Sequence, residues 1–194
     1  MEEKQEMGYK ERLYDAIEKI QCKKNEACSY DEMLEDILSR LEDMRRQQGT
    51  LFFIGNGGSA GIAMHMTTDF LKNGHVRTHG MHDPAMLTCL GNDYGYPYVF
   101  SKQLELVASP GDMLVAISSS GKSPNILEGV RVAREKGCHI LALSGFEADN
   151  PLRGMGDSSI YVPSMEYGIV ESVHNIILQQ IVDLLMARDK EEGR

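Results

Sequence analysis

The sequence lacks a long apolar run and contains few cysteines. No stretch of the 194-residue chain approaches the about 18 to 20 consecutive apolar residues of a membrane span, and the polar N-terminus holds no apolar signal core. The four cysteines, Cys22, Cys28, Cys89 and Cys138, form no C-x-x-C pair, and Cys89 and Cys138 lie in apolar, strand-like surroundings. Buried free thiols are typical of a reducing compartment. We therefore expect a soluble cytoplasmic protein with no membrane partner.

Positive charge is also scarce. The chain has 20 Lys and Arg residues against 29 Asp and Glu residues, which gives a formal net charge of −9. This balance argues against a general affinity for nucleic acid or for an anionic membrane surface. Any bound phosphate must therefore be held by local geometry.

Hydrophobic residues make up 42% of the chain, enough to bury one sizeable core. Residues 8–47 have the apolar period of helices, and Ser29 or Asp31 is placed to cap the second of them. These apolar stripes exceed what the rest of the fold needs, which indicates an interface. We expect a helical extension over residues 1–48 that serves oligomerisation, an α/β domain over 49–188 and a frayed charged tail over 189–194, within one structural domain overall.

After Gly49 the pattern changes to short apolar runs that alternate with helical stretches. Five runs are interpreted as buried strands, at residues 51–54, 85–88, 113–117, 140–143 and 159–162. The helical stretches lie near residues 59–73, 93–107, 123–137 and 166–188. This alternation predicts an α/β fold with a five-stranded parallel sheet that is covered by helices on both faces.

Two loops of small residues each follow a strand-like run and precede a helical stretch. They are Gly55-Asn56-Gly57-Gly58-Ser59-Ala60 and Ser118-Ser119-Ser120-Gly121-Lys122-Ser123. A strand that turns sharply into a helix directs backbone N–H groups and the positive end of the helix dipole toward an anion. In an open parallel sheet both loops would emerge at the carboxyl ends of the strands, where ligands bind. The pair predicts a cradle for a phosphorylated small molecule, although the serines could also simply cap the helix near Ser123.

Two nucleotide motifs compete with this interpretation. Gly55-x-Gly57-x-x-Ala60 satisfies a relaxed dinucleotide fingerprint, but the only acidic residue at the required distance is Asp83, in an unpromising turn. Residues 116–123 fit a P-loop if alanine is allowed at its first position, yet the strand at 140–143 ends in Ser144-Gly145 rather than in a magnesium-binding acid. Neither motif explains why both loops exist, so we expect no nucleotide cofactor.

Three separated motifs, Gly-Asn-Gly-Gly-Ser-Ala, Asn92-Asp93-Tyr94-Gly95 and Ile-Ser-Ser-Ser-Gly-Lys-Ser-Pro-Asn, occur in an order that resembles the sugar isomerase (SIS) domain family, in its phosphoheptose isomerase branch. The likeness extends from about residue 8 to residue 187. It implies a flavodoxin-like three-layer sandwich, a homotetramer with sites between subunits, and the aldose–ketose isomerisation of sedoheptulose 7-phosphate to a heptose 7-phosphate.

The resemblance also implies roles for individual residues. It places Asn56, Gly57, Gly58 and Ser59 at the substrate, Asn92 and Asp93 at the sugar, and Ser118, Ser119, Ser120 and Ser123 at the phosphate. The hydroxyls and backbone N–H groups of the second loop suit the three acceptor oxygens of a phosphate monoester.

The catalytic residues follow the family pattern less closely. Isomerisation through an enediol needs a base beside the carbonyl and an acid or metal at the developing oxyanion. The family's helical His-x-x-x-Glu corresponds to His65 and Asp69, its Gln to Glu171 and its terminal His to Gln179, and this set would also hold zinc. Gln179 cannot transfer a proton, so Glu171 or His65 would have to replace the family's acid/base pair. We therefore expect Asp69 to be the base, and Glu171 and His65 to serve as acid, base or metal ligands.

The departures leave a rival interpretation. Some SIS relatives keep the fold and the phosphate loops as non-catalytic binding or regulatory proteins, which Gln179 favours and the retained His65, Asp69 and Glu171 disfavour. Each side chain also has a structural alternative: His65 as a packed histidine, and Glu171 as a charge in the first turns of the last helix or as a partner of His174.

Overall fold

The structure is a computed structural model that describes residues 7–193. Residues 1–6 of the expected extension and Arg194 of the expected tail lie outside the described residues. The chain begins with α1 (Tyr9–Glu18), the strands β1 (Gln21–Lys23) and β2 (Ala27–Cys28), and α2 (Tyr30–Arg46). It continues through β3 (Leu51–Gly55), α3 (Gly58–Lys72), β4 (Thr78–Gly80), α4 (Pro84–Tyr94), the 3-10 helix η1 (Tyr96–Tyr98), α5 (Ser101–Val107), β5 (Met113–Ser118), α6 (Pro124–Glu135), β6 (His139–Ser144), α7 (Pro151–Met155), β7 (Ser158–Tyr161) and α8 (Tyr167–Glu191).

The sheet has the strand order β2-β1-β7-β6-β5-β3-β4. Strands β4, β3, β5, β6 and β7 are parallel, while β1 pairs antiparallel with both β7 and β2. The parallel part has the order of the flavodoxin-like fold, so the expected class is confirmed. The two short antiparallel strands extend the sheet at one edge, which the helical period assigned to residues 8–47 did not predict.

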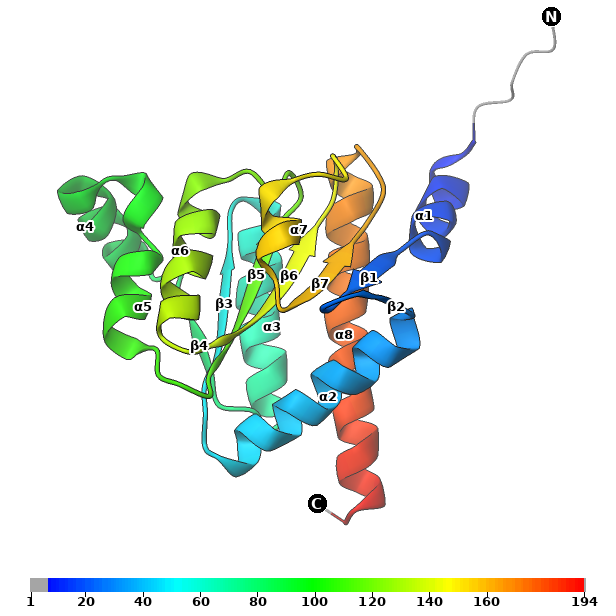
Figure 1. The fold of residues 1–194 in the computed structure, drawn as a ribbon, viewed down its shortest axis with the longest axis horizontal. Helices are drawn as coiled ribbons and strands as arrows, with labels where there is room; N and C mark the ends of the chain where they lie inside the picture. The colour runs from blue at the N-terminus through cyan, green and yellow to red at the C-terminus, as the bar shows by residue number, and fades with distance from the viewer. Residues whose placement is uncertain (1–6, 194) are drawn as a thin grey trace, which may run out of the picture.

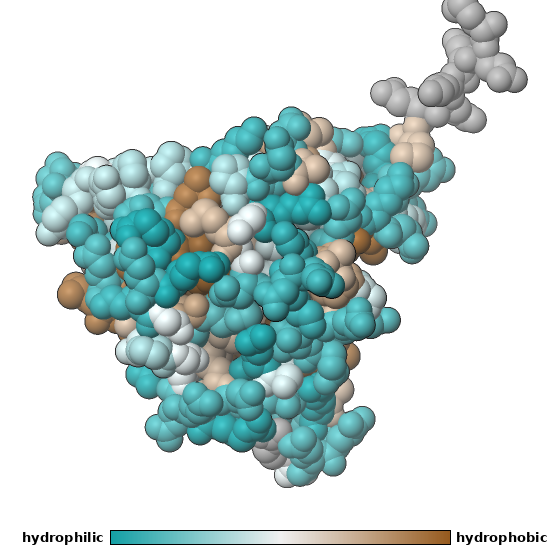
Figure 2. All heavy atoms as spheres, viewed as in Figure 1, coloured by the Kyte–Doolittle hydropathy of each residue, from teal (hydrophilic) through white to brown (hydrophobic). Residues whose placement is uncertain are grey.

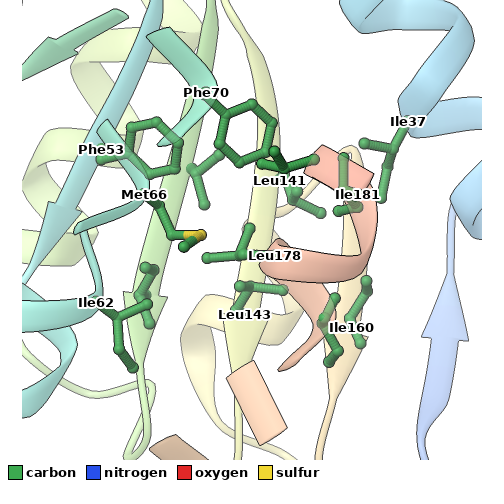
Figure 3. Packing of buried hydrophobic residues seen from close by; sticks show 14 of the residues in the cluster. Ile37, Phe53, Ile62, Met66, Phe70, Leu141, Leu143, Ile160, Leu178 and Ile181 are labelled. Atoms are coloured by element: carbon green, nitrogen blue, oxygen red, sulfur yellow. The ribbon is translucent and has the colours of Figure 1, made fainter. Parts of the chain in front are cut away.

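Helices cover both faces of the sheet and give three layers (Figure 1). One core lies between the sheet and α2, α3 and α8. Figure 3 shows Phe53 of β3, Phe70 and Met66 of α3, and Leu178 of α8 meeting within it. A second core lies between the opposite face of the sheet and α5, α6 and α7. The central strands β3 and β5 are buried along their whole length, which explains their continuous apolar runs.

The start of α2 confirms one of the two expected caps. The Ser29 hydroxyl accepts a hydrogen bond from the backbone N–H of Glu32 at 3.2 Å, and the Glu32 carboxylate accepts one from the backbone N–H of Ser29 at 2.8 Å. This reciprocal pair satisfies two N–H groups that a helix start otherwise leaves free.

The expected strand at 85–88 is wrong. These residues lie in α4, whose N-cap Asp83 accepts a hydrogen bond from the backbone N–H of Met86 at 2.9 Å, with Pro84 in the first turn. Aspartate followed by proline is a helix-start signal, and here it outweighs the apolar run. The fifth parallel strand is β4, at the edge of the sheet. Cys89 is consequently exposed on a helix, whereas Cys138 is buried as expected.

Two expected helices have different bounds. The stretch at 93–107 is divided into the end of α4, η1 and α5, because Gly95 adopts a φ of +89° after α4. The last helix, α8, continues to Glu191, so residues 189–191 of the tail that we expected to fray are helical. Asp189 is buried, and its carboxylate accepts a hydrogen bond from Arg45 of α2 at 2.7 Å, which holds this end of α8.

Helix α8 is long and apolar enough, by length and composition, to cross a membrane, although half of its most apolar window is buried in the protein. Its apolar residues pack against the sheet and α2 and α3, as in the core helix of a soluble protein. The face in Figure 2 is mainly hydrophilic, with hydrophobic atoms in a seam and at the edge near α5.

Candidate active site

A cavity of about 400 Å³ lies at the carboxyl ends of β3 and β5. The pairing of β3 with β5 runs from Leu51↔Met113 to Gly55↔Ile117, so the loops that follow the two strands emerge side by side. The chain then passes to α3 on one face of the sheet and to α6 on the other, which makes this the switch point where open α/β sheets bind ligands. The cavity is lined by Asn56, Gly57, Gly58, Ser59, Ile117, Ser118, Ser119, Ser120, Ser123, Tyr167 and Glu171.

The first loop is shaped by glycine. Gly57 has a φ of +54°, a conformation that side chains rarely adopt, and Gly58 then begins α3. A Cβ on Gly55 would lie 2.6 Å from the carbonyl group of Ser59, so the turn into α3 could not close with a larger residue there. The first N–H groups of α3 therefore lie beside the cavity with the positive end of the helix dipole.

The second loop contributes four serines to the cavity lining, Ser118, Ser119, Ser120 and Ser123. The Ser118 hydroxyl accepts a hydrogen bond from the backbone N–H of Gly121 at 3.2 Å and lies 3.5 Å from the Ser123 hydroxyl. The Ser120 hydroxyl accepts one from the backbone N–H of Lys122 at 3.3 Å. The Ser119 hydroxyl is buried and has no hydrogen-bond partner among the described residues. A buried hydroxyl without a partner is costly unless a ligand satisfies it.

A support beneath the second loop fixes its turn. Gly121 has a φ of +61°, and its Cα packs against the side chain of Asn150, which leaves no room for a Cβ. The Asn150 amide donates to the carbonyl oxygens of Gly145 at 3.1 Å and Glu147 at 2.8 Å. The loop is thus preorganised rather than free to close on a ligand.

Among residues 7–193, Glu171 is the one carboxylate in the cavity lining. It projects from the second turn of α8 and packs against the Cα of Gly58. Tyr167, one turn earlier, also lines the cavity, and its ring packs edge-on against Phe146 with centroids 4.7 Å apart. Both side chains belong to α8. The cavity is therefore lined by three segments that lie far apart in the sequence: the loop after β3, the loop after β5 and the start of α8.

Several expected site residues lie away from this cavity. His65 and Asp69 lie together on α3, with 3.6 Å between Nε2 and Oδ2, but they are two and three turns beyond Gly58, about 10 and 16 Å along the helix. Gln179 is two turns beyond Glu171, and its amide donates to Asp183 at 3.3 Å. None of the three lines the cavity.

Asn92 and Asp93 are exposed on α4, where the Asn92 amide donates to the Asp93 carboxylate at 2.9 Å. They do not line the cavity either. The segment that carries them contacts the site through Tyr96, whose hydroxyl donates to the side-chain oxygen of Asn56 at 3.0 Å.

The expected zinc ligands do not converge within one chain. His65 and Asp69 form a pair, while Glu171 lies in the cavity and Gln179 binds Asp183. Among residues 7–193 no three His, Cys, Asp or Glu side chains form a group able to hold a metal ion. The donor set therefore does not fit zinc in a single subunit.

A buried histidine, His174, and a half-buried one, His82, each contact a backbone carbonyl at the end of a strand next to the site. The His174 ring is completely buried and donates from Nε2 to the carbonyl oxygen of Ser144 at 3.2 Å; burial lowers its pKa to about 4, so the ring is neutral. His82 donates from Nε2 to the carbonyl oxygen of Gly55 at 2.9 Å, and burial lowers its pKa as well. His174 thus faces the sheet rather than forming a pair with Glu171.

Sequence reasoning missed three residues at this site: Asn125, Tyr96 and Tyr167. Asn125 closes the Ser-Pro-Asn motif, which was the available signal for it. Tyr96 and Tyr167 carry no such signal, because isolated tyrosines in loops and helix starts are common.

Comparison with known proteins identifies the family. Residues 29–145 match the family model described as the SIS domain, which is more than half of the chain. The chain belongs to the SIS domain family. The phosphoheptose isomerase of Pelobacter propionicus is 32% identical to this SIS-domain protein over 159 residues, which cover 79% of the chain and 84% of the relative. That of Geobacter sp. strain M21 is 35% identical over 158 residues, which cover 78% and 82%.

Solved structures agree with these relatives. The phosphoheptose isomerase of Neisseria gonorrhoeae superposes with a TM-score of 0.74 at 30% identity, covering 79% of this chain and 86% of the other. That of Francisella tularensis gives a TM-score of 0.75 at 26% identity, covering 80% and 86%. These relatives favour the isomerase over the non-catalytic alternative.

Proposed function

We propose that this protein is a cytoplasmic sugar-phosphate aldose–ketose isomerase of the phosphoheptose type, which converts sedoheptulose 7-phosphate to a heptose 7-phosphate. The observation that carries the proposal is the cavity at the switch point, where the glycine loop, the serine loop and the Glu171 carboxylate meet. The named phosphoheptose isomerases that match most of the chain support the same reaction.

The serine loop binds the phosphate group. Ser118, Ser119, Ser120 and Ser123 offer hydroxyls, and the loop precedes the start of α6, whose first N–H groups favour an anion. The buried Ser119 hydroxyl gains a charged acceptor when phosphate enters, which removes its cost. The chain as a whole carries a net charge of −9 and therefore does not attract anions in general. Phosphate binding depends on the hydroxyl and N–H groups of this loop.

Glu171 acts as the base. With the phosphate in the second loop, the sugar extends toward Glu171 and the first N–H groups of α3. The carboxylate removes the proton from C1 of the ketose and returns it to C2, while the proton of the C1 hydroxyl moves to the oxygen on C2. The N–H groups of Gly58 and Ser59 stabilise the negative charge that develops on the enediolate oxygen.

The remaining residues complete the site between subunits. His65 is exposed and Asp69 is partly exposed, so the pair is available to the cavity of a neighbouring subunit in the homotetramer that we propose. Met64, Leu71, Ile176 and Met186 are exposed apolar residues on α3 and α8 and fit such an interface. We propose the same use for the apolar stripes of the N-terminal helices and for Asn92 and Asp93 on α4. Zinc binding by His65, Asp69, Glu171 and Gln179 would require this assembly, and no step above depends on it.

A turnover assay tests the function directly. Sedoheptulose 7-phosphate and a panel of C5 to C6 sugar phosphates are supplied to the wild type with and without added Zn²⁺, and to Glu171→Gln. We expect turnover of the heptulose phosphate and a loss of about 10² to 10⁴-fold in kcat for Glu171→Gln. Binding of sugar phosphates without turnover of any would establish the non-catalytic alternative instead.

A further inference from the structure

The amide side chain of Asn56 is held by two residues that lie outside the cavity lining. Its Nδ2 donates to the Oδ1 of Asn125 at 2.9 Å, and its Oδ1 accepts from the Nδ2 of Asn125 at 2.8 Å. The same oxygen also accepts from the Tyr96 hydroxyl at 3.0 Å. Asn125 and Tyr96 are referred to below as the amide clasp.

The clasp accounts for most of the hydrogen-bonding capacity of Asn56. An asparagine side chain offers two N–H donors and an oxygen with two acceptor positions. Here both acceptor positions and one donor are used by the protein, so one N–H of the Asn56 side chain remains. Because Asn56 lines the cavity, this N–H is what its side chain offers to a ligand.

The clasp also joins three segments of the site. Asn125 is 1% exposed and lies in the first turn of α6, directly after the serine loop, where its Oδ1 additionally accepts from the backbone N–H of Ile126 at 3.1 Å. Tyr96 lies in η1, just after the helix that carries Asn92 and Asp93. Because the Oδ1 of Asn125 accepts from the backbone of Ile126, the orientation of the Asn125 amide is fixed. Its two hydrogen bonds to Asn56 then fix which way the Asn56 amide faces.

We propose that Asn125 and Tyr96 are positioning residues that orient the Asn56 amide so that its remaining N–H donates to a sugar oxygen of the substrate. This inference rests on the proposed function for the identity of the ligand. In the reversed orientation, the oxygen of Asn56 would face the sugar and the Oδ1 of Asn125, and its NH₂ group would face the NH₂ group of Asn125, so both hydrogen bonds between the two amides would be lost. The clasp thereby gives the first loop a hydrogen-bond donor, while the serine loop holds the phosphate independently.

The test separates sugar recognition from phosphate recognition. Affinities for inorganic phosphate and for sedoheptulose 7-phosphate are measured by calorimetry for the wild type, Tyr96→Phe, Asn125→Leu and the double variant. Tyr98→Phe, an exposed tyrosine of the same 3-10 helix, is the matched control. Tyr96→Phe removes one hydroxyl at an exposed position, so it leaves the fold intact.

We expect Tyr96→Phe to weaken sedoheptulose 7-phosphate binding by about 3- to 10-fold and Asn125→Leu by about 10-fold or more, the scale of lost or unsatisfied hydrogen bonds. Phosphate affinity should change by less than about 2-fold, and the double variant should lose less than the product of the two single losses, because both act on one amide. Tyr98→Phe should match the wild type.

Two results would overturn the clasp. One is wild-type affinity for the sugar phosphate in Tyr96→Phe, which decides the matter even where Asn125→Leu does not fold. The other is an equal loss of phosphate and sugar-phosphate affinity in Asn125→Leu, which would place its effect on the serine loop. Binding of phosphate but of no sugar phosphate by the wild type would overturn the proposed function itself, a result that the variants do not mimic.

Discussion

The Glu171 carboxylate occupies the space that a side chain on Gly58 would need. A Cβ built on Gly58 would overlap both carboxylate oxygens and lie 2.6 Å from Oε1. The absence of a side chain at the start of α3 therefore allows a residue from the last helix to pack against the first loop. This contact joins the glycine motif to the residue that we propose as the base.

Gly58→Ala should displace Glu171 and lower kcat for the heptulose phosphate by about tenfold or more, while the protein remains folded, because a misplaced base loses its reach to the substrate proton. Gly61→Ala is the matched control on the same helix, since a Cβ there meets nothing within 4 Å. It should raise the free energy of unfolding by up to about 1 kcal/mol and leave kcat unchanged. Equal activity of the two variants in the turnover assay would show that Glu171 is not the base.

Ser119→Ala should have opposite effects on stability and on binding. The Ser119 hydroxyl is buried without a partner in the ligand-free protein, so its removal should leave the free energy of unfolding unchanged or raise it. Sugar-phosphate affinity should fall by about tenfold, the scale of a hydrogen bond to a charged group. Calorimetry and thermal unfolding of the same samples measure both effects, and a decrease in stability with unchanged affinity would contradict the phosphate assignment.

Gln179→His tests the departure from the family pattern. The substitution adds a group that can transfer a proton at the position where the family has histidine, so kcat should rise if that position serves the chemistry. The gain should depend on His65 and vanish in the double variant with His65→Gln. A brisk wild-type rate that falls in Gln179→His would show that our alignment of α8, or the role assigned to Gln179, is wrong.

Stability should depend on pH through two histidines, the buried His174 and the partly buried His139. Burial holds the pKa of His174, and mainly burial that of His139, at about 4 in the folded protein, below the about 6.5 of the unfolded chain. Between these pKa values the unfolded state binds more protons than the folded state. The contribution of each histidine to the free energy of unfolding is therefore fully present above about pH 6.5. It is lost as the pH falls toward 4, by up to about 1.4 kcal/mol per pH unit for each histidine.

Denaturant titrations at several pH values measure this slope. His174→Gln keeps a donor for the Ser144 carbonyl oxygen and should reduce the slope between pH 4 and 6.5. A slope that is the same in His174→Gln as in the wild type would show that this ring does not titrate with unfolding.

The assembly prediction concerns the exposed apolar residues of α3 and α8. We expect light scattering at micromolar concentration to give the mass of a homotetramer, since closed symmetry would cover these residues on every subunit. Met64→Glu together with Leu71→Glu should lower the mass and, with it, the turnover that needs a neighbouring subunit. A monomeric wild type would exclude a site between subunits.

Much of the fold was predictable because its elements carry local signals. The buried strands at 51–54, 113–117, 140–143 and 159–162 are continuous apolar runs, as expected when both faces of a sheet are covered, and each agrees with a strand of the structure within a residue or two. The run at 85–88 has the same composition, but Asp83 and Pro84 fix a helix start before it. A local cap decided that case.

The sequence by itself determined that two small-residue loops each follow a buried strand and precede a helix, because apolar runs and loop chemistry depend on contiguous residues. Only the tertiary structure decided which side chains complete the cavity. Glu171 reaches Gly58 because α8 packs beside α3 on one face of the sheet. Asn125 reaches Asn56 across 69 residues because α6, on the opposite face, begins at the same carboxyl edge as α3. His65 and Asp69, which share a helix with the first loop, are carried away from the cavity by the rise of that helix.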